Sequence, residues 1–166
     1  MQEDSGAPSG AAAQPVSHLQ RRELQAPLAA CLIREFAKTV GEAAAVEIAT
    51  RAIQEDARSS GRALAEKLGG NGLAELARVV REVWSEGEAV SIRLLEESGE
   101  RLSFDVLRCR YAEMYEAQGL KGLGFCLSCS RDGAFAEGFN PRIALSRTQT
   151  IMEGAACCDF RFTLKP

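Results

Sequence analysis

The stretch of sequence that decides the fold is VSIRLLEESGERLSFDV, residues 90–106. Apolar and polar residues alternate from Val90 to Leu94, and the alternation resumes from Leu102 to Val106 after a turn at residues 97–100. A period of two is typical of a β-strand with one buried face, because successive side chains of a strand point to opposite faces of the sheet. Two such runs around a short turn that contains glycine predict a β-hairpin.

Before the hairpin, the apolar residues recur at the spacing of a helix. The first predicted helix carries an apolar stripe that we expect to pack in the core: Leu28, Leu32, Phe36 and Val40. A second helix follows Gly41, is weakened internally by Gly61 and ends at the glycine-rich residues 69–72. Its expected core residues are Ile48, Ala49, Ala52, Ile53, Leu64 and Leu68. A third helix is expected to bury Leu73, Leu76, Ala77, Val80 and Trp84.

After the hairpin, the chain is predicted to add helix and two more strands. A helix is expected over residues 109–118, and residues 123–137 indicate one kinked helix or two short ones. Alternation from Ile143 to Thr148 and a run from Cys158 to Leu164 predict a third and a fourth strand. Helices first and an antiparallel sheet afterwards predict the α+β class, with N-terminal helices packed on a small antiparallel sheet of about four strands.

The two ends of this plan differ in composition. Residues 1–19 are rich in Gly, Ala, Ser, Pro and Gln and offer little to bury, so they predict a flexible leader. Residues 20–166 are expected to form a single domain, because a chain of 166 residues is long enough to bury one core.

Composition and charge limit the classes of partner. The net charge is −3 and no polybasic cluster is present, which argues against nucleic acid and against a membrane surface as partners. No apolar run reaches the roughly 20 residues that span a bilayer, and the N-terminus has no apolar signal segment. The six cysteines accompany a sizeable core, so we expect reduced thiols in a cytoplasmic protein. A homo-oligomer stays an open alternative.

Arg147 is the first candidate for a functional side chain, because it has the parity of the apolar residues in the third strand. A buried guanidinium needs an anionic partner. The sequence offers Asp132, Glu153 and Asp159 for a structural ion pair. The alternative partner is the carboxylate of a ligand, which a guanidinium binds through two parallel hydrogen bonds.

The thiols include a CxxC pair, Cys126 and Cys129, and an adjacent pair, Cys157 and Cys158. Adjacent cysteines are poor ligands of one tetrahedral zinc ion, so we predict no metal and no cofactor. A redox pair, a single nucleophilic or substrate-contacting thiol, and small buried apolar residues stay as alternatives. The lone histidine, His18, is interpreted as an incidental surface residue at the edge of the leader, which argues against a Ser-His or Cys-His mechanism.

Three acids lie among these residues: Asp132, Glu153 and Asp159. Solvated surface acids are the ordinary interpretation. If two of them converge in a dry pocket, however, their pKa values separate and one can act as a general base.

Residues 124–162, GFCLSCSRDGAFAEGFNPRIALSRTQTIMEGAACCDFRF, resemble the C-terminal signature of the L-2-amino-thiazoline-4-carboxylic acid hydrolases. The most characteristic pieces are CSRD at 129–132, GFNP at 138–141, RTQT at 147–150, EG at 153–154 and CDF at 158–160. The run CRYAEMYEAQGL, from Cys109, fits the helix that precedes them in that family. The ending is also loosely similar to the 4-vinyl-reductase domain and its relatives in the nitric-oxide-signalling and Golgi-transport ligand-binding fold.

The resemblance implies a hydrolase that opens the ring of L-2-amino-thiazoline-4-carboxylate, or of a similar cyclic amidine, to S-carbamoyl-cysteine. Such a reaction needs a carboxylate anchor, a group that activates water or attacks the ring, and a proton donor for the departing nitrogen. For this chemistry we expect substrate-binding roles for Asn140, Arg147, Thr148 and Glu153. We expect catalytic roles for Cys129, Asp132 and Asp159.

Cys129 is the expected nucleophile if the mechanism is covalent, and nearby Arg131 is expected to lower its pKa. The alternative function is a non-catalytic small-molecule-binding or sensor domain of the 4-vinyl-reductase type. The expected partner of the hydrolase is a small-molecule substrate that carries a carboxylate.

Overall fold

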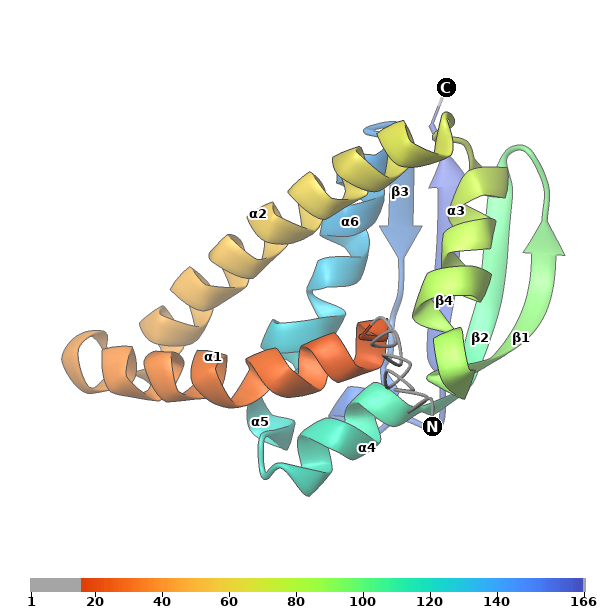
Figure 1. The fold of residues 1–166 in the computed structure, drawn as a ribbon. Coiled ribbons are helices and arrows are strands. Elements are labelled where there is room, and N and C mark those ends of the chain that lie inside the picture. The colour runs from red at the N-terminus through yellow and green to blue at the C-terminus, as the bar shows by residue number, and fades with distance from the viewer. Residues whose placement is uncertain (1–15, 166) are drawn as a thin grey trace, which may run out of the picture.

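The computed structural model describes residues 16–165 and shows a four-stranded antiparallel sheet with helices over one of its faces (Figure 1). The part before the hairpin contains α1 (His18–Val40), α2 (Glu42–Leu68), α3 (Leu73–Val79), the π-helical turn η1 (Val80–Trp84) and the 3-10 turn η2 (Glu86–Glu88). The hairpin consists of β1 (Val90–Glu97) and β2 (Arg101–Cys109). The remainder contains α4 (Arg110–Ala117), α5 (Lys121–Gly124), the π-helical turn η3 (Phe125–Cys129), α6 (Arg131–Phe139), β3 (Ile143–Ser146), the 3-10 turn η4 (Ile151–Glu153) and β4 (Cys158–Leu164).

The predicted α+β class and the hairpin are confirmed. The strands lie in the order β1-β2-β4-β3, so the last strand of the chain enters between the hairpin and β3. The predicted helical stretch 123–137 is a kinked one, in which α5, η3 and α6 follow one another. The strand β3 ends at Ser146, two residues earlier than predicted, because the next amides donate to a side chain of β4 instead of to the sheet.

The main core lies between the inner face of the sheet and the helices α3 and α6. Phe104 of β2 and Phe160 of β4 stack with their ring centroids 4.9 Å apart. Phe162 and Phe139 are fully buried beside them, together with Leu76 of α3. Rings in this offset arrangement add about 0.5–1.5 kcal/mol to what their burial alone contributes, so this cluster fixes the helices on the sheet. Of the predicted core residues of the third helix, Leu73, Leu76, Ala77 and Val80 are buried, whereas Trp84 is only partly buried against the same cluster.

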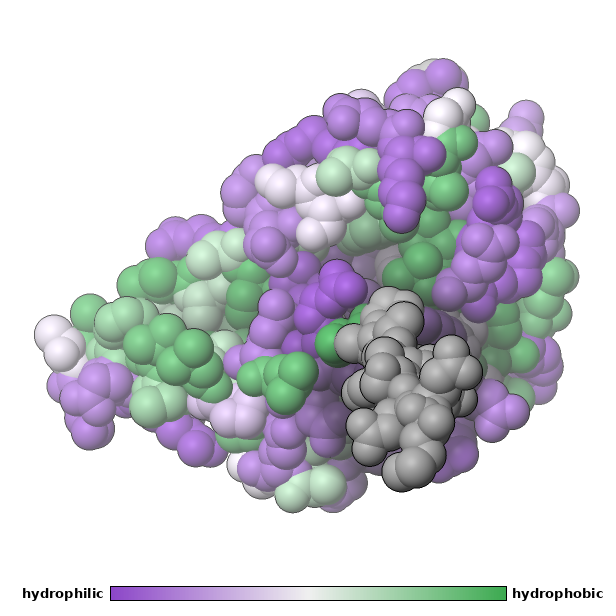
Figure 2. Space-filling model, in the orientation of Figure 1, coloured by the Kyte–Doolittle hydropathy of each residue, from purple (hydrophilic) through white to green (hydrophobic). Residues whose placement is uncertain are grey.

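The predicted burial of the first apolar stripe is wrong. Leu28, Leu32, Phe36 and Val40 are 67%, 48%, 54% and 48% exposed. The face of α1 that packs against its neighbours consists mainly of small residues, Ala26 and Ala30, with Ile33. Residues four positions apart on a helix are rotated by about 40° from one another, so a stripe at this spacing identifies a helix without showing which face is buried. Hydrophobic residues along α1 are visible at the surface in Figure 2.

The expected core of α2 is only partly correct, because Ile48 and Ala52 are exposed. Its buried residues are small: Ala45, Ala57 and Gly61. Most of the predicted leader, residues 1–15, lies outside the described residues, and α1 begins at His18. Within residues 16–165, no helix combines the length and the apolar character that crossing a membrane requires.

The helices α2 and α6 cross (Figure 1). Gly61 does not simply weaken α2, because it lies against the main chain of α6 at residues 135–139. A Cβ atom on Gly61 would overlap the carbonyl oxygen of Phe135, and one on Gly138 would overlap the carbonyl oxygen of Arg58. The two helices therefore touch through their main chains, and each contributes a glycine at the point of contact. No flexible side chain is available there to move aside.

We expect Gly138→Ala to destabilise the protein by about 1–3 kcal/mol, because the added methyl group forces the two helix backbones apart. Gly133→Ala in the same helix is the matched control, since the nearest atom to its added Cβ would lie 4.0 Å away. That variant should be neutral or more stable by about 0.5–1 kcal/mol, because alanine favours a helix. Urea unfolding measures both, and equal effects of the two substitutions would contradict the proposed contact.

Candidate functional site

A cavity of about 430 Å³ lies between the helices and the inner face of the sheet. The first turn of α1, the second half of α2, the turn η1 and the start of α6 form its walls. Phe104 and Val106 of β2 and Cys158 and Phe160 of β4 form its floor. Segments from both ends of the chain therefore meet at one site.

Most of the wall is apolar. Trp84 lies at the centre of this part, with its ring centroid 5.6 Å from that of Phe135 and 6.4 Å from that of Phe160. Val80 and Val83 of the same π-helical turn line the cavity beside it. The second π-helical turn, η3, presents Cys129. Turns of this kind are rare in proteins overall, and those that occur are often found at functional sites. The extra residue in the turn redirects the side chains around it.

The polar side of the cavity contains Arg147 and Asp132. Arg147 points inward as predicted, and its Nη1 lies 2.5 Å from Asp132 Oδ2. Its Nη2 donates to the carbonyl oxygen of Cys129 at 3.0 Å, and its guanidinium carbon lies 4.9 Å from the ring centroid of Phe160. Burial raises the pKa of the Asp132 carboxyl, and the guanidinium of Arg147 opposes that rise. The structure therefore gives Arg147 an internal partner, and Asp132 is that partner.

Cys129 lines the cavity, but its thiol is not activated in the way we expected. Burial raises its pKa far above the usual range, and the carboxyl of Asp132 raises it further, while Arg147 opposes the rise. The expected lowering by Arg131 is wrong, because the Arg131 guanidinium is paired with Asp56 at 2.5 Å. The thiol is therefore protonated at neutral pH.

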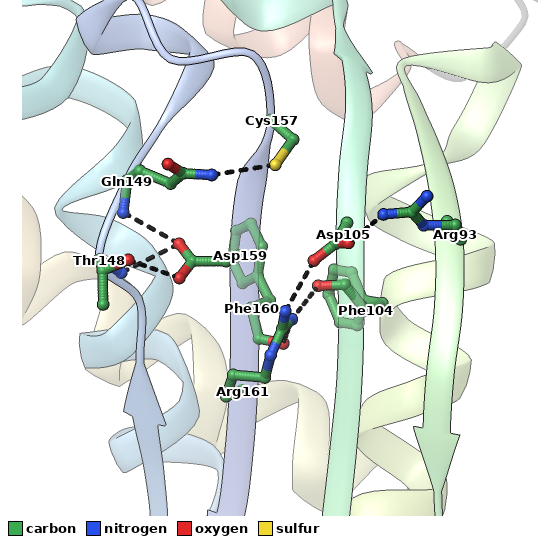
Figure 3. Close-up of polar contacts among 9 residues, drawn as sticks. All are labelled: Arg93, Phe104, Asp105, Thr148, Gln149, Cys157, Asp159, Phe160 and Arg161. Atoms are coloured by element: carbon green, nitrogen blue, oxygen red, sulfur yellow. Dashed lines mark hydrogen bonds and ion pairs between the residues drawn. The ribbon is translucent and has the colours of Figure 1, made fainter.

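Asp159 does not line the cavity. Its carboxylate faces the segment after β3 (Figure 3). One carboxylate oxygen accepts hydrogen bonds from the amides of Thr148 and Gln149 at 2.9 Å each, and the other accepts from the Thr148 hydroxyl at 2.7 Å. Burial alone would raise the pKa of Asp159, but these hydrogen bonds outweigh it and lower the pKa. Asp159 and Thr148 thus hold the segment after β3 against β4, away from the cavity.

Asn140 and Glu153 also lie outside the cavity lining. The Asn140 amide donates to the carbonyl oxygen of Asn71 at 3.0 Å and accepts from the amide of Arg142 at 2.9 Å, so it ties the loop after α2 to the end of α6. Glu153 accepts a hydrogen bond from the Thr150 hydroxyl at 2.7 Å. Of the seven predicted site residues, the cavity brings together three: Cys129, Asp132 and Arg147.

The interpretation of His18 as an incidental surface residue is wrong, because its ring lines the cavity. Its Nδ1 lies 2.8 Å from the hydroxyl of Tyr111, and its Nε2 lies 3.4 Å from Nη2 of Arg22. A signal for this position was present in the sequence: Ser17 and Gln20 form a capping box, which places the start of α1 at His18.

The partners of His18 determine its tautomer. A guanidinium can only donate, so Nε2 accepts from Arg22 and the proton resides on Nδ1, which donates to the hydroxyl of Tyr111. Tyr111 in turn donates to the carbonyl oxygen of Trp84 at 3.4 Å. Burial, together with the nearby charge of Arg22, lowers the pKa of His18 to about 4. The ring is therefore neutral at physiological pH.

The charge of the lining is strongly unequal. Among residues 16–165, one acid lines the cavity, Asp132, against five cationic residues: Arg21, Arg22, Lys67, Arg131 and Arg147. Arg131 and Arg147 are paired with acids, whereas no acid of residues 16–165 lies within ion-pair distance of Arg22. Over the same residues, no three His, Cys, Asp or Glu side chains are grouped so that they could hold a metal ion.

Comparisons with known proteins place this chain within a family. The family model described as L-2-amino-thiazoline-4-carboxylic acid hydrolase matches residues 21–162. None of the curated proteins gives a significant match.

Two solved structures share the fold. A trafficking protein particle complex subunit 3 from Naegleria fowleri, covalently bound to palmitic acid, is 13% identical with a TM-score of 0.53, over 88% of this chain and 96% of that chain. The phenol-responsive sensory domain of the transcription activator PoxR, with phenol, is 12% identical with a TM-score of 0.53, over 91% of this chain and 76% of that chain. They agree with the expected likeness to the Golgi-transport ligand-binding fold.

The low pKa of His18 predicts how stability responds to acid. Between pH 6.5 and about 4 the unfolded chain binds a proton at His18 that the folded protein does not bind. The free energy of unfolding should therefore fall as the pH falls through this window, by at most about 1.4 kcal/mol per pH unit from this group. In His18→Gln this contribution is lost. The stability difference between the two proteins, measured by urea unfolding, should shrink from pH 6.5 to 4 and stay constant above pH 7, and a constant difference throughout would refute the assignment.

Proposed function

Because this chain belongs to the L-2-amino-thiazoline-4-carboxylic acid hydrolase family, we propose that it hydrolyses a non-peptide carbon–nitrogen bond in a small cyclic amidine that carries a carboxylate. With L-2-amino-thiazoline-4-carboxylate, water adds to C2 and the bond from C2 to the ring nitrogen breaks. The sulfur keeps the carbamoyl group, the nitrogen becomes the α-amine, and the product is S-carbamoyl-cysteine.

The observation that carries this proposal is the excess of cationic groups around the cavity. Arg22 is half-buried in the cavity wall, and no acid of residues 16–165 pairs with it, which leaves a partly desolvated charge without a counter-ion. The carboxylate of a substrate would supply the missing charge. The expected role of Arg147 as the anchor changes accordingly, because Asp132 already neutralises it. Arg22 donates only to neutral groups, Gln25 Oε1 at 3.1 Å and His18 Nε2 at 3.4 Å, so its charge is available to a substrate carboxylate.

Asp132 is the group best suited to move the protons. Its carboxyl lies at the cavity wall with a raised pKa, which keeps it basic enough to take a proton from an attacking water. The same carboxyl would then return that proton to the departing ring nitrogen. Arg147 holds Asp132 in place and can stabilise the charge that develops on the substrate.

The protonated thiol of Cys129 favours activated water over a covalent mechanism. A thiolate, not a thiol, is the nucleophile in covalent catalysis, and none of the cations of this cavity lowers the pKa of Cys129 below its usual range. The neutral His18 holds the hydroxyl of Tyr111 by a hydrogen bond, and this hydroxyl can orient a polar group of the substrate.

A second candidate function is ligand binding without chemistry. The two solved structures that share the fold contain palmitic acid and phenol, and the apolar wall around Trp84 would suit such ligands. A turnover assay separates the two candidate functions, because a hydrolase converts the substrate to product and a binding domain only binds it.

We expect the purified protein to convert L-2-amino-thiazoline-4-carboxylate to S-carbamoyl-cysteine. Mass spectrometry measures the formation of this product. Asp132→Asn should lower kcat by roughly 100-fold to 10,000-fold, because the general acid/base is removed. Asp159→Asn is the informative comparison, since that carboxylate binds main-chain amides outside the cavity. It should lower the melting temperature and leave kcat within a few-fold of the parent, whereas loss of turnover in the folded protein would restore Asp159 to the site.

The role of the thiol is tested by Cys129→Ser. If water attacks directly, this variant should keep kcat within about tenfold of the parent, because the thiol contributes only to the shape of the wall. Thermal unfolding of the same sample shows whether the variant is folded. Abolished turnover in a folded variant, together with a covalent adduct on the parent protein, would establish Cys129 as the nucleophile.

A further inference from the structure

The cavity is larger than the thiazoline carboxylate that the proposed function assigns to it. That molecule has about nine non-hydrogen atoms, and at the ~30 Å³ that a water occupies in the liquid, an upper limit for a bonded atom, it fills about 270 Å³. The cavity measures about 430 Å³, which leaves room for roughly five more non-hydrogen atoms.

The unfilled part has a definite chemical character. The groups that would hold the polar ring and its carboxylate are two contacting pairs in the lining, Asp132 with Arg147 and Arg22 with the neutral His18. Phe160 lies between the polar and the apolar groups of the lining. The guanidinium carbon of Arg147 lies 4.9 Å from the centroid of its ring, and the ring centroid of Trp84 lies 6.4 Å from it. The apolar part of the lining includes Val80, Val83 and Trp84 of η1 and Phe135 of α6, with Trp84 and Phe135 in contact.

A small polar substrate would leave this apolar surface against water. Burying apolar area stabilises a complex by about 25 cal/mol per Å², so a ligand that covers these rings binds more tightly than one that does not. The surface is also accessible: Ala63 and Lys67 of α2 line the cavity and are exposed, and Figure 2 shows a hollow between α2 and α3.

We propose that the physiological ligand is a carboxylate that carries an apolar substituent, with the carboxylate held at Arg22 and the substituent packed against Trp84 and Phe135. This inference rests on the proposed function only for the polar head of the ligand. For the hydrolase it names the substrate class, a cyclic amidine carboxylate with an alkyl or aryl substituent.

The chain offers its own reporter for this part of the cavity, because Trp84 is its single tryptophan. We would titrate the protein with butanoate, hexanoate and octanoate and follow the fluorescence of Trp84. Each buried methylene should raise the affinity about fourfold, so octanoate should bind at least about tenfold more tightly than butanoate even when burial is incomplete. An affinity independent of chain length would overturn the proposal.

A pair of variants locates the substituent. Ala63→Phe adds a ring at an exposed helical position that lines the cavity, and it should reduce the gain per methylene. Ala52→Phe is the matched control, since Ala52 is exposed on the same helix and does not line the cavity. It should leave the series unchanged, and equal behaviour of the two variants would place the alkyl chain elsewhere.

The carboxylate is located by Arg22→Gln, with Arg34→Gln as the control, because Arg34 is exposed on the same helix and outside the cavity lining. The first variant should weaken octanoate roughly tenfold and leave octanol unaffected, as expected for the loss of a charge-assisted hydrogen bond. The same samples are assayed with the thiazoline. If the thiazoline is turned over but butanoate, hexanoate and octanoate bind equally well, this inference alone is overturned. If affinity rises with the length of the alkyl chain but the thiazoline is not turned over, the ligand class is supported and the proposed hydrolysis is removed.

Discussion

The structure depends on the main-chain contact between α2 and α6 at Gly61 and Gly138. This contact brings two helix backbones closer together than side chains would allow, and it fixes the position of α6 over the sheet. Asp132 and Phe135 of α6 thereby face the second half of α2 across the cavity. The width of the cavity is therefore set by the absence of two side chains as much as by the residues that line it.

The parts of the fold that could be predicted from the sequence are those that local spacing determines. The hairpin at residues 90–106 and the last strand follow from alternation, and the inward position of Arg147 follows from the same parity. The buried face of α1 could not be predicted in this way. An apolar stripe and a stripe of small residues both have helical spacing, and the choice between them depends on how closely α2 and α4 approach.

The residues of the candidate site also differ in whether local sequence could predict them. Asp132 and Arg147 lie 15 positions apart within the segment that resembles the hydrolase family, so they could be predicted together. His18 and Arg22 reach the cavity only because α1 folds back against Tyr111, a residue 93 positions from His18. The parity that places Phe160 inside also places Asp159 outside, so the exclusion of Asp159 was within reach of the sequence.

The six thiols differ strongly in their surroundings, with a practical consequence for spectroscopy. Cys31 is exposed on the outer surface of α1, whereas the other five are buried or partly covered. Burial also raises the pKa values of Cys109, Cys126, Cys129 and Cys158, which makes those thiols slow to react with alkylating reagents. A nitroxide spin label would therefore attach preferentially to the native chain at Cys31. Its paramagnetic resonance spectrum would report whether the mobility of α1, whose first turn lines the cavity, changes when a ligand binds.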